Sequence, residues 1–387
     1  MHKALLAASA LEAFFLLMLL GYGPLYLHQA FHAMDVVASL ASAGPALATF
    51  VGSTLWGHRL HHVGIGRVAR LGLLGYVATG AVALMAPDPV VYIVGVTVTT
   101  LFSAALAPAA LTFLTQAGGE MGRRLADRLK WQSSGWMVGG AIGGYVQALA
   151  THAFPALLLA LGLTMLVPFF AMRGQVDQAP GGPTEKAMDE PSLLGLTILL
   201  VLPFFLAYAG NEGFFTNFGL YLRGLHVSTS WVGWSAAIST GLGWVLATSI
   251  GRWADRFGGK SLLIRVLAGY ALIYLTMSLS SSEVVVIVAF SLPLYPLLNI
   301  GIQRAVAESL PGDRHGGAMG IINGAAGLAT FGGSVIMGAV DNFFGPRNMP
   351  WAAIACVAIG LILASILYRS RKPVRPMGTP REPSKPI

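Results

Sequence analysis

Long apolar runs dominate this chain, and short polar segments separate them. A helix needs about 20 apolar residues to cross the hydrocarbon of a membrane. The spans are expected to be helical because lipid offers the backbone no hydrogen-bond partner. Runs of the required length predict twelve spans, at residues 4–27, 36–56, 68–86, 90–114, 132–151, 154–172, 193–222, 231–250, 262–280, 284–306, 318–340 and 350–368.

The composition agrees with an integral membrane protein and argues against a soluble enzyme. Of the 387 residues, 55% are hydrophobic and 10% are charged, whereas a soluble domain carries about 25% charged residues. A single cysteine, Cys356, leaves no intramolecular disulfide and no cysteine metal cluster. The sequence contains no complete nucleotide-binding or hydrolase motif. We therefore expect no enzymatic activity, no cofactor and no metal site.

The basic residues predict the topology of the spans. The chain has 24 basic and 16 acidic residues, a net charge of +8. With an N-terminus in the cytoplasm, only Arg223 and Arg347 fall on the outer side, so 22 of the 24 basic residues lie on the cytoplasmic side. Because cytoplasmic loops are enriched in Lys and Arg, both termini are predicted to be cytoplasmic and the chain to be a multi-pass protein of the cytoplasmic membrane. The positive charge then reflects topology, and nucleic acid is not an expected partner.

Two related halves are indicated by the loops and by recurring segments. The polar, proline-containing segment 173–192 divides the spans six and six, which is typical of a linker. Tyr26 near the end of the first span and Tyr221 near the end of the seventh are 195 residues apart, and Gly57 and Gly251 are 194 apart. We predict an N-terminal bundle at 1–172, a cytoplasmic linker at 173–192, a C-terminal bundle at 193–368 and a disordered cytoplasmic tail at 369–387.

The segment GRWADRFGGK after the eighth span resembles the loop signature of the major facilitator superfamily. In the first half, His61 and His62 stand where that signature has Asp-Arg. The resemblance implies an all-α integral membrane fold with twelve transmembrane helices in two pseudo-symmetric six-helix bundles. It also implies a gating loop, in which a carboxylate makes contacts in one conformation only. The gating residues would be Gly251, Asp255, Arg256, Gly258 and Lys260, with a purely topogenic loop as the alternative.

Glycines spaced by four recur in both halves, at Gly135/Gly139/Gly143 and at Gly316/Gly320/Gly324. Such spacing lets membrane helices approach closely, either as static packing or as a moving seam. The segment 135–144 also resembles the glycine-rich fifth-helix motif of the drug antiporters of the same superfamily, with Gly140 in place of the expected proline.

Two glutamates inside predicted spans are the strongest candidates for proton coupling. Glu12 lies in the first span and Glu212 in the seventh, which are equivalent helices of the two halves. An ionised group within a membrane is energetically expensive, so a carboxyl group there is suited to carrying a proton. A structural hydrogen bond is the alternative for both, and it is the favoured reading for Glu12, which is closer to the cytoplasmic end.

Polar and aromatic residues within the spans predict a substrate cavity. Arg304 is either an anion contact in the cavity or a residue that extends to the cytoplasmic surface. Trp136 could line a site for an aromatic or amphipathic substrate. The predicted cavity residues are Tyr22, Tyr26, Gln132, Trp136, Tyr208, Asn211, Asn217, Asn299, Gln303, Arg304 and Asn323.

These features predict a secondary active transporter that moves a small organic solute across the cytoplasmic membrane by alternating access. Proton-coupled efflux of a drug-like or sugar-like compound is the first hypothesis, and proton-coupled uptake of a sugar or nucleoside is the second. A membrane sensor that kept the fold without transport is an alternative from another class. The expected partners are the small-molecule substrate, protons and the lipid bilayer, and a monomer is expected.

Overall fold

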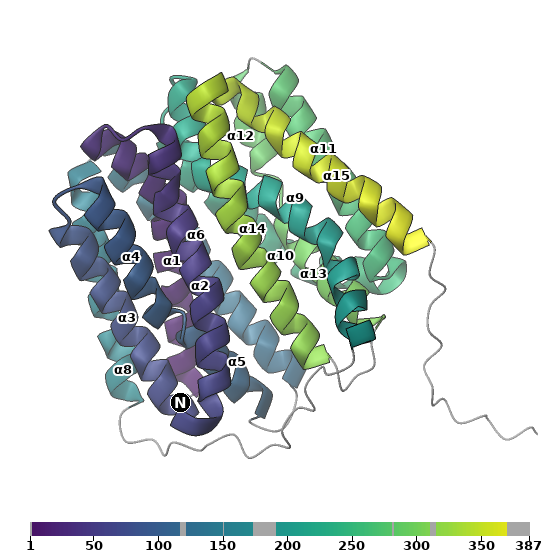
Figure 1. Cartoon of the computed structure of the whole chain (residues 1–387), viewed down its shortest axis with the longest axis horizontal. Coiled ribbons are helices and arrows are strands. Elements are labelled where there is room, and N and C mark those ends of the chain that lie inside the picture. The colour runs from purple at the N-terminus through teal and green to yellow at the C-terminus, as the bar shows by residue number, and fades with distance from the viewer. Residues whose placement is uncertain are drawn as a thin grey trace, which may run out of the picture.

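The computed structural model describes residues 2–116, 121–149, 151–172, 191–280, 282–309 and 315–369. The regular structure within these ranges is helical, and the helices lie side by side across the molecule (Figure 1). We call the side on which α1 begins the N-terminal side and the opposite side the far side. The predicted linker and tail lie outside the described residues, except that residues 191 and 192 already belong to α9 and Arg369 ends α15.

The helices follow the predicted spans closely. The first half, residues 2–172, contains α1 (His2–Phe31), α2 (Asp35–Val63), α3 (Ile65–Met85), α4 (Pro89–Ser103), α5 (Leu106–Gln116), α6 (Met121–Leu149), η1 (Thr151–Ala153), α7 (Phe154–Thr164) and α8 (Leu166–Ala171). The second half, residues 191–369, contains α9 (Pro191–Gly224), α10 (Ser230–Phe257), α11 (Gly259–Leu279), α12 (Glu283–Phe290), α13 (Leu294–Ala307), α14 (His315–Phe344), η3 (Pro346–Asn348) and α15 (Met349–Arg369).

Three predicted spans are each built from two helical pieces, and a proline explains each break. Proline has no N–H, so the carbonyl four residues earlier loses its helical partner. Pro108 removes the partner of Ala104, where α4 gives way to α5, and Pro168 follows the break between α7 and α8 in the same way. The third break lies between α12 and α13, where Pro296 leaves the carbonyl of Leu292 without its helical partner. This carbonyl accepts a hydrogen bond from Ser239 Oγ at 3.3 Å. The fourth and tenth spans are equivalent in the two halves, and both are broken.

Ten helical segments in the described residues are long and apolar enough to cross a membrane. The helices α6 and α10, which cover the predicted fifth and eighth spans, are not among the ten. Both carry many glycine and polar residues, and they pack against each other between the two halves. A multi-pass membrane protein is therefore confirmed, while the count of twelve spans stays a prediction.

The two halves meet along two tightly packed helix pairs, α6 with α10 and α2 with α14 (Figure 1). A Cβ atom at Gly233 would overlap the carbonyl oxygen of Gly140, and one at Gly338 would overlap the side chain of Ser39. The helix α1 also packs on α9, where Leu25 lies against Gly219. These contacts lie toward the far side of the molecule, so the halves are closed against each other there.

The glycines of α6 contact two neighbouring helices, and those spaced by four (the glycine ladder) all face the same one. Cβ atoms at Gly135, Gly139 and Gly143 would overlap residues of α1, so these three positions hold α6 against α1 within the first half. Gly140 and Gly144, one residue further along, face α10 of the second half. Static packing therefore describes the predicted ladder, and the seam between the halves uses its immediate neighbours. In the second ladder Gly324 faces Phe50 of α2, and the side-chain positions of 316 and 320 lie outside the described residues.

We expect Gly233→Leu to open the far side of this seam. A side chain there must push the backbones of α6 and α10 apart, and overpacking of this kind costs about 1–3 kcal/mol. The measurement is the labelling rate of a cysteine at the buried Leu25 position by a water-soluble maleimide, in a Cys356→Ala background. The labelling should be faster with Gly233→Leu. Gly332→Leu is the matched control, because its Cβ would meet no atom within 4 Å, and equal rates for both variants would contradict the prediction.

Candidate functional site

Glu12 of α1 is buried in the first half and is held by side chains from two other helices. Tyr76 of α3 donates a hydrogen bond to Glu12 Oε1 at 3.3 Å, and Arg128 Nη2 of α6 lies 3.5 Å from Glu12 Oε2. Arg128 Nε also donates to Ser9 Oγ at 3.2 Å. The carboxylate of Glu12 therefore has a cationic partner inside the bundle.

This ion pair corrects the sequence interpretation of Arg128. In the predicted topology Arg128 is a loop residue, because the fifth span is predicted to begin at residue 132. The helix α6 begins at Met121, and Arg128 lies within it and is largely buried. The pairing favours the structural reading of Glu12 over a proton-coupling role, although that role itself stays a prediction.

Glu212 of α9 has a different environment, although it occupies the equivalent helix of the second half. Its side chain is 8% exposed. Asn211 Nδ2 donates to Glu212 Oε1 at 3.3 Å, and Tyr274 in turn donates to Asn211 Oδ1 at 3.0 Å. In the described part of the chain, no Lys, Arg or His nitrogen lies within 4.0 Å of this carboxylate. Burial without a cation is expensive for an ionised carboxylate.

Tyrosines from three helices surround Glu212. Tyr208 lies one helical turn before Glu212 in α9, and Tyr274 of α11 is linked to Glu212 through Asn211. Tyr295 of α13 packs on Tyr208, and Tyr270 of α11 packs on Tyr274. The hydroxyl oxygens of Tyr208 and Tyr295 lie 3.0 Å apart, and the rings of Tyr270 and Tyr274 are stacked with centroids 6.1 Å apart. We call Glu212 with these four tyrosines the tyrosine cluster.

Trp136 joins the tyrosine cluster to the first half. Its ring lies 5.7 Å from that of Tyr295, at an interplanar angle of 33°. Trp136 is in α6 and Tyr295 in α13, so this contact crosses the interface between the halves. Both side chains are only partly buried. A rearrangement of one half against the other would therefore change the surroundings of the cluster.

The structure brings Trp136, Tyr208, Asn211 and Glu212 together and places Asn299 beside them, because its amide donates to the carbonyl of Tyr295 at 3.3 Å. Gln132 lies one helical turn before Trp136 and is half-buried, while Gln303 and Asn323 are exposed on α13 and α14.

Other predicted cavity residues lie elsewhere. Tyr22 is fully buried at the seam, where its hydroxyl donates to the carbonyl of Gly140 at 3.1 Å. Tyr26 packs among Tyr92 and Phe154 in the interior of the first half. Asn217 donates to the carbonyls of Gly213 and Ser334, which ties α9 to α14. The contacts of these three residues are those of helix packing.

The predicted gating loop is a tight connection between α10 and α11. The backbone of Gly251 and Asp255 belongs to α10, but the side-chain position of each lies outside the described residues. Gly258 has a φ of +71°, a conformation that favours glycine. Arg256 is exposed, with its guanidinium 5.7 Å from the ring centre of Phe257, and Lys260 is half-buried in the first turn of α11.

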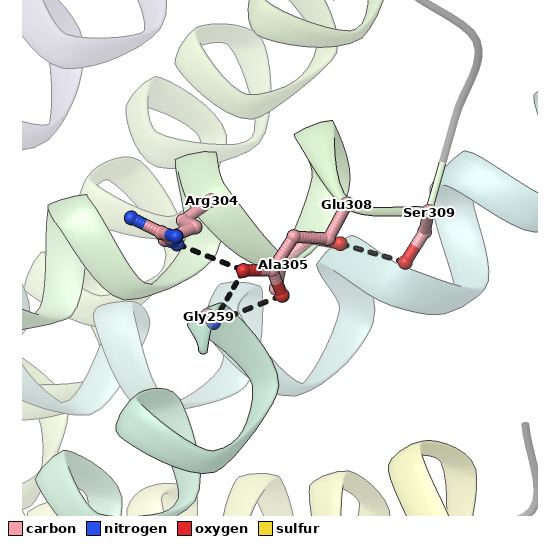
Figure 2. Close-up of polar contacts among 5 residues, drawn as sticks. All are labelled: Gly259, Arg304, Ala305, Glu308 and Ser309. Carbon is pink, nitrogen blue, oxygen red and sulfur yellow. Dashed lines mark hydrogen bonds and ion pairs between the residues drawn. The ribbon is translucent and has the colours of Figure 1, made fainter. Parts of the chain in front are cut away.

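A carboxylate missed by the sequence analysis binds this connection from another helix. Figure 2 shows Glu308, just after α13, pointing at the first turn of α11, where Gly259 N–H donates to its two carboxylate oxygens at 3.2 and 3.0 Å. The N-terminus of a helix favours negative charge. Arg304 Nε donates to Glu308 Oε1 at 2.8 Å, so Arg304 is engaged at the end of α13. That contact favours its surface role over an anion contact in the cavity.

Charged groups also gather on the far side, where the halves are closed. His28 Nδ1 lies 2.6 Å from Asp35 Oδ1 in the first half. Asp341 of α14 is buried, and Asp35, His28 and Arg223 of α9 are the charged or titratable groups near it. These side chains lie at the far-side end of the α2–α14 contact. Polar groups as well as closely packed glycines therefore lie where the two halves meet on the far side.

Comparisons with known proteins place this arrangement in a family. The sequence profile described as the Major Facilitator Superfamily matches residues 5–297 and 200–386. The chain belongs to the major facilitator superfamily. No curated protein sequence matches the chain.

Solved structures with the same fold include several transporters. The crystal structure of nucleoside transporter NupG superposes with a TM-score of 0.70 at 13% identity, covering 95% of this chain and 98% of that one. Peptide transporter POT in complex with sulfate gives 0.75 at 13% identity, covering 95% and 93%. A bacterial homolog of the human lysosomal transporter Spinster, inward-facing and occupied, gives 0.73 at 12% identity, covering 96% of each chain. At these identities the likeness shows the fold alone.

Several residues of the site in this major facilitator protein were not predicted from the sequence. Tyr295 had a usable signal, since it lies four residues before Asn299 on the same helical face and just after a proline break. Tyr270 and Tyr274 share a helical face, but tyrosines in a membrane helix do not reveal which helix they meet. Arg128 and Glu308 needed the fold, because their partners are 116 and 49 residues away in sequence.

We expect Arg128→Met to destabilise the protein, because it leaves the carboxylate of Glu12 buried without its cation. Breaking a buried pair by removing one partner costs about 3–5 kcal/mol. Thermal unfolding in detergent should show a lower Tm for the single variant. The double variant Glu12→Gln with Arg128→Met should recover much of the loss, and a double variant as unstable as the single one would contradict a direct coupling.

Glu308→Ala should loosen the start of α11, because Gly259 N–H then loses its acceptor and the helix end its negative charge. Loss of such a cap costs about 1 kcal/mol. Hydrogen exchange at Gly259 measures the effect directly, and it should be faster in the variant. Glu308→Gln keeps one acceptor oxygen and should fall between the two proteins; unchanged exchange in Glu308→Ala would remove the capping role.

Proposed function

We propose that this chain is a proton-coupled secondary transporter that exports a small organic solute by alternating access, with Glu212 as the proton-carrying residue. The observation that carries the proposal is the contrast between the two membrane glutamates. Glu12 is neutralised by Arg128 at 3.5 Å, whereas Glu212 is buried among tyrosines with no cation within 4.0 Å among the described side chains.

A buried carboxyl group without a cation is most readily accommodated when it holds a proton. An ionised group in the membrane interior is costly, and that cost falls when the group is solvated. Opening the interface beside Trp136 and Tyr295 admits water and favours release of the proton, while closing it favours uptake. Glu212 is thereby coupled to the movement of the halves, as a proton-driven transporter requires.

The export direction is supported by the seam between the halves. The segment 135–144 resembles the fifth-helix motif of drug antiporters, and its Gly140 packs on Gly233 of the other half. The nucleoside transporter NupG, at 13% identity, bears on the fold of this chain and leaves nucleoside uptake as the second hypothesis.

The remaining expectations form part of the same proposal. The chain is proposed to act as a monomer in the cytoplasmic membrane, with both termini in the cytoplasm and with the boundaries 1–172, 173–192, 193–368 and 369–387. The loop residues Gly251, Asp255, Arg256, Gly258 and Lys260 are proposed to stabilise one of the two alternating conformations. Glu308 caps α11 and so connects the end of α13 to this loop between α10 and α11, which supports a structural role for the loop.

Liposomes that contain the purified protein and an internal pH dye test the coupling. Addition of substrates from a panel of drug-like, sugar and nucleoside compounds should move protons through the native protein. Glu212→Gln should abolish this movement, because an amide cannot release a proton at neutral pH. Glu283→Gln is the matched control, since Glu283 is exposed in the first turn of α12. Unaltered substrate-dependent proton flux in Glu212→Gln would refute the assignment, and no flux with any substrate would favour the sensor.

A further inference from the structure

The tyrosine cluster combines one negative group with several aromatic faces. Tyr208, Tyr274 and Tyr295 come from α9, α11 and α13, and Trp136 lies over Tyr295 from the other half. Aromatic rings attract cations through their electron-rich faces and also pack against apolar groups. A carboxylate within such a ring of aromatic side chains is suited to a ligand that carries a positive charge on an apolar body.

We propose that the tyrosine cluster binds an amphipathic organic cation, with its charged group at Glu212 and its apolar body against Tyr295 and Trp136. This inference rests on the proposed function, because it assigns a substrate class to the same site. Glu212 has no cationic partner among the described side chains, so the ligand supplies the missing positive charge. Trp136 and Tyr295 are partly exposed, which leaves part of each side chain free for contact.

Two arginines that could receive an anionic substrate are already engaged. Arg128 contacts Glu12 and Ser9 in the first half, and Arg304 contacts Glu308 at the end of α13. A neutral solute supplies no countercharge once Glu212 has released its proton, whereas a cation does. Of the three charge classes of substrate, the cation is therefore the one that the charges around the cluster favour.

A single carboxylate that binds either a proton or the cation also couples the transport of one to the transport of the other. Glu212 binds either one proton or the cationic group, because one negative charge neutralises one positive charge in a buried site. Release of the proton on one side is required before the cation binds, and the reverse exchange occurs on the other side. For a monovalent cation the exchange is one for one and moves no net charge across the membrane.

Binding of tetraphenylphosphonium to the purified full-length protein in detergent tests this inference. The probe keeps its charge at every pH, so any pH dependence belongs to the protein. Its affinity should weaken as the pH falls, approaching tenfold per pH unit at acid pH, because protons compete for the same carboxylate. Triphenylphosphine oxide, a neutral molecule with similar aromatic rings, should bind more weakly and without this dependence.

Variants distinguish the contribution of the Glu212 charge to binding from that of the aromatic rings. Glu212→Gln should weaken tetraphenylphosphonium binding and remove its pH dependence, while Glu283→Gln should bind as the native protein does. Trp136→Leu should weaken binding and keep the pH dependence, and Trp136→Phe should restore much of the affinity. Thermal unfolding in detergent shows whether each variant is folded. If Glu212→Gln does not fold, Glu212→Asp is used in its place.

The outcomes distinguish this inference from the proposed function. Tetraphenylphosphonium binding that is independent of pH, or unchanged in Glu212→Gln, would overturn the cation site. Absence of tetraphenylphosphonium binding, together with Glu212-dependent proton movement driven by a neutral solute, would overturn the substrate class and leave proton-coupled transport in place. Absence of Glu212-dependent proton movement with every substrate would overturn the proposed transport, and the cation site would fall with it unless tetraphenylphosphonium binding still depended on pH and on Glu212.

Discussion

The cost of a charge in an apolar interior is the constraint on which the rest of this molecule depends. It confines nearly all basic residues to loops and helix ends, which is why their distribution predicts a topology. It also makes each buried exception informative. Glu12 meets the constraint through Arg128 and Tyr76 within its own half. Glu212 of α9 has only hydrogen-bonding partners among the described side chains, so this carboxyl group needs either a proton or a cation from outside.

Packing between the halves follows from a related property of the membrane. Lipid is as apolar as leucine, so apolar side chains alone do not drive two helices together. Close approach of backbones does, and it requires glycine at the contact. Gly140 against Gly233, and Gly338 against Ser39, provide such contacts toward the far side. In the proposed alternating access, the same contacts hold one conformation and separate in the other, and a seam of small residues suits that movement.

Much of the fold could be predicted from the sequence, because span length and the backbone's need for internal partners leave few alternatives. The helix ends agree with the apolar runs to within a few residues for most spans. The fifth span was the main miss, since α6 extends eleven residues before residue 132 through Arg128. A hydropathy pattern ends a span where charge begins, and it cannot recognise a charge whose partner is Glu12 on another helix.

The site was less predictable, because its geometry depends on which helices meet. Glu212, Asn211 and Tyr208 share one helix and were found from their spacing, while Tyr274 and Tyr295 enter from α11 and α13. The same limit applies to the two glutamates. The sequence indicates that both are buried acids, and it does not show that, among the described side chains, a cation lies near Glu12 alone. If the two halves arose by duplication, as the recurring segments predict, then a change in the partners of one carboxylate would be a simple way to obtain a structural ion pair at Glu12 and the proposed exchangeable site at Glu212.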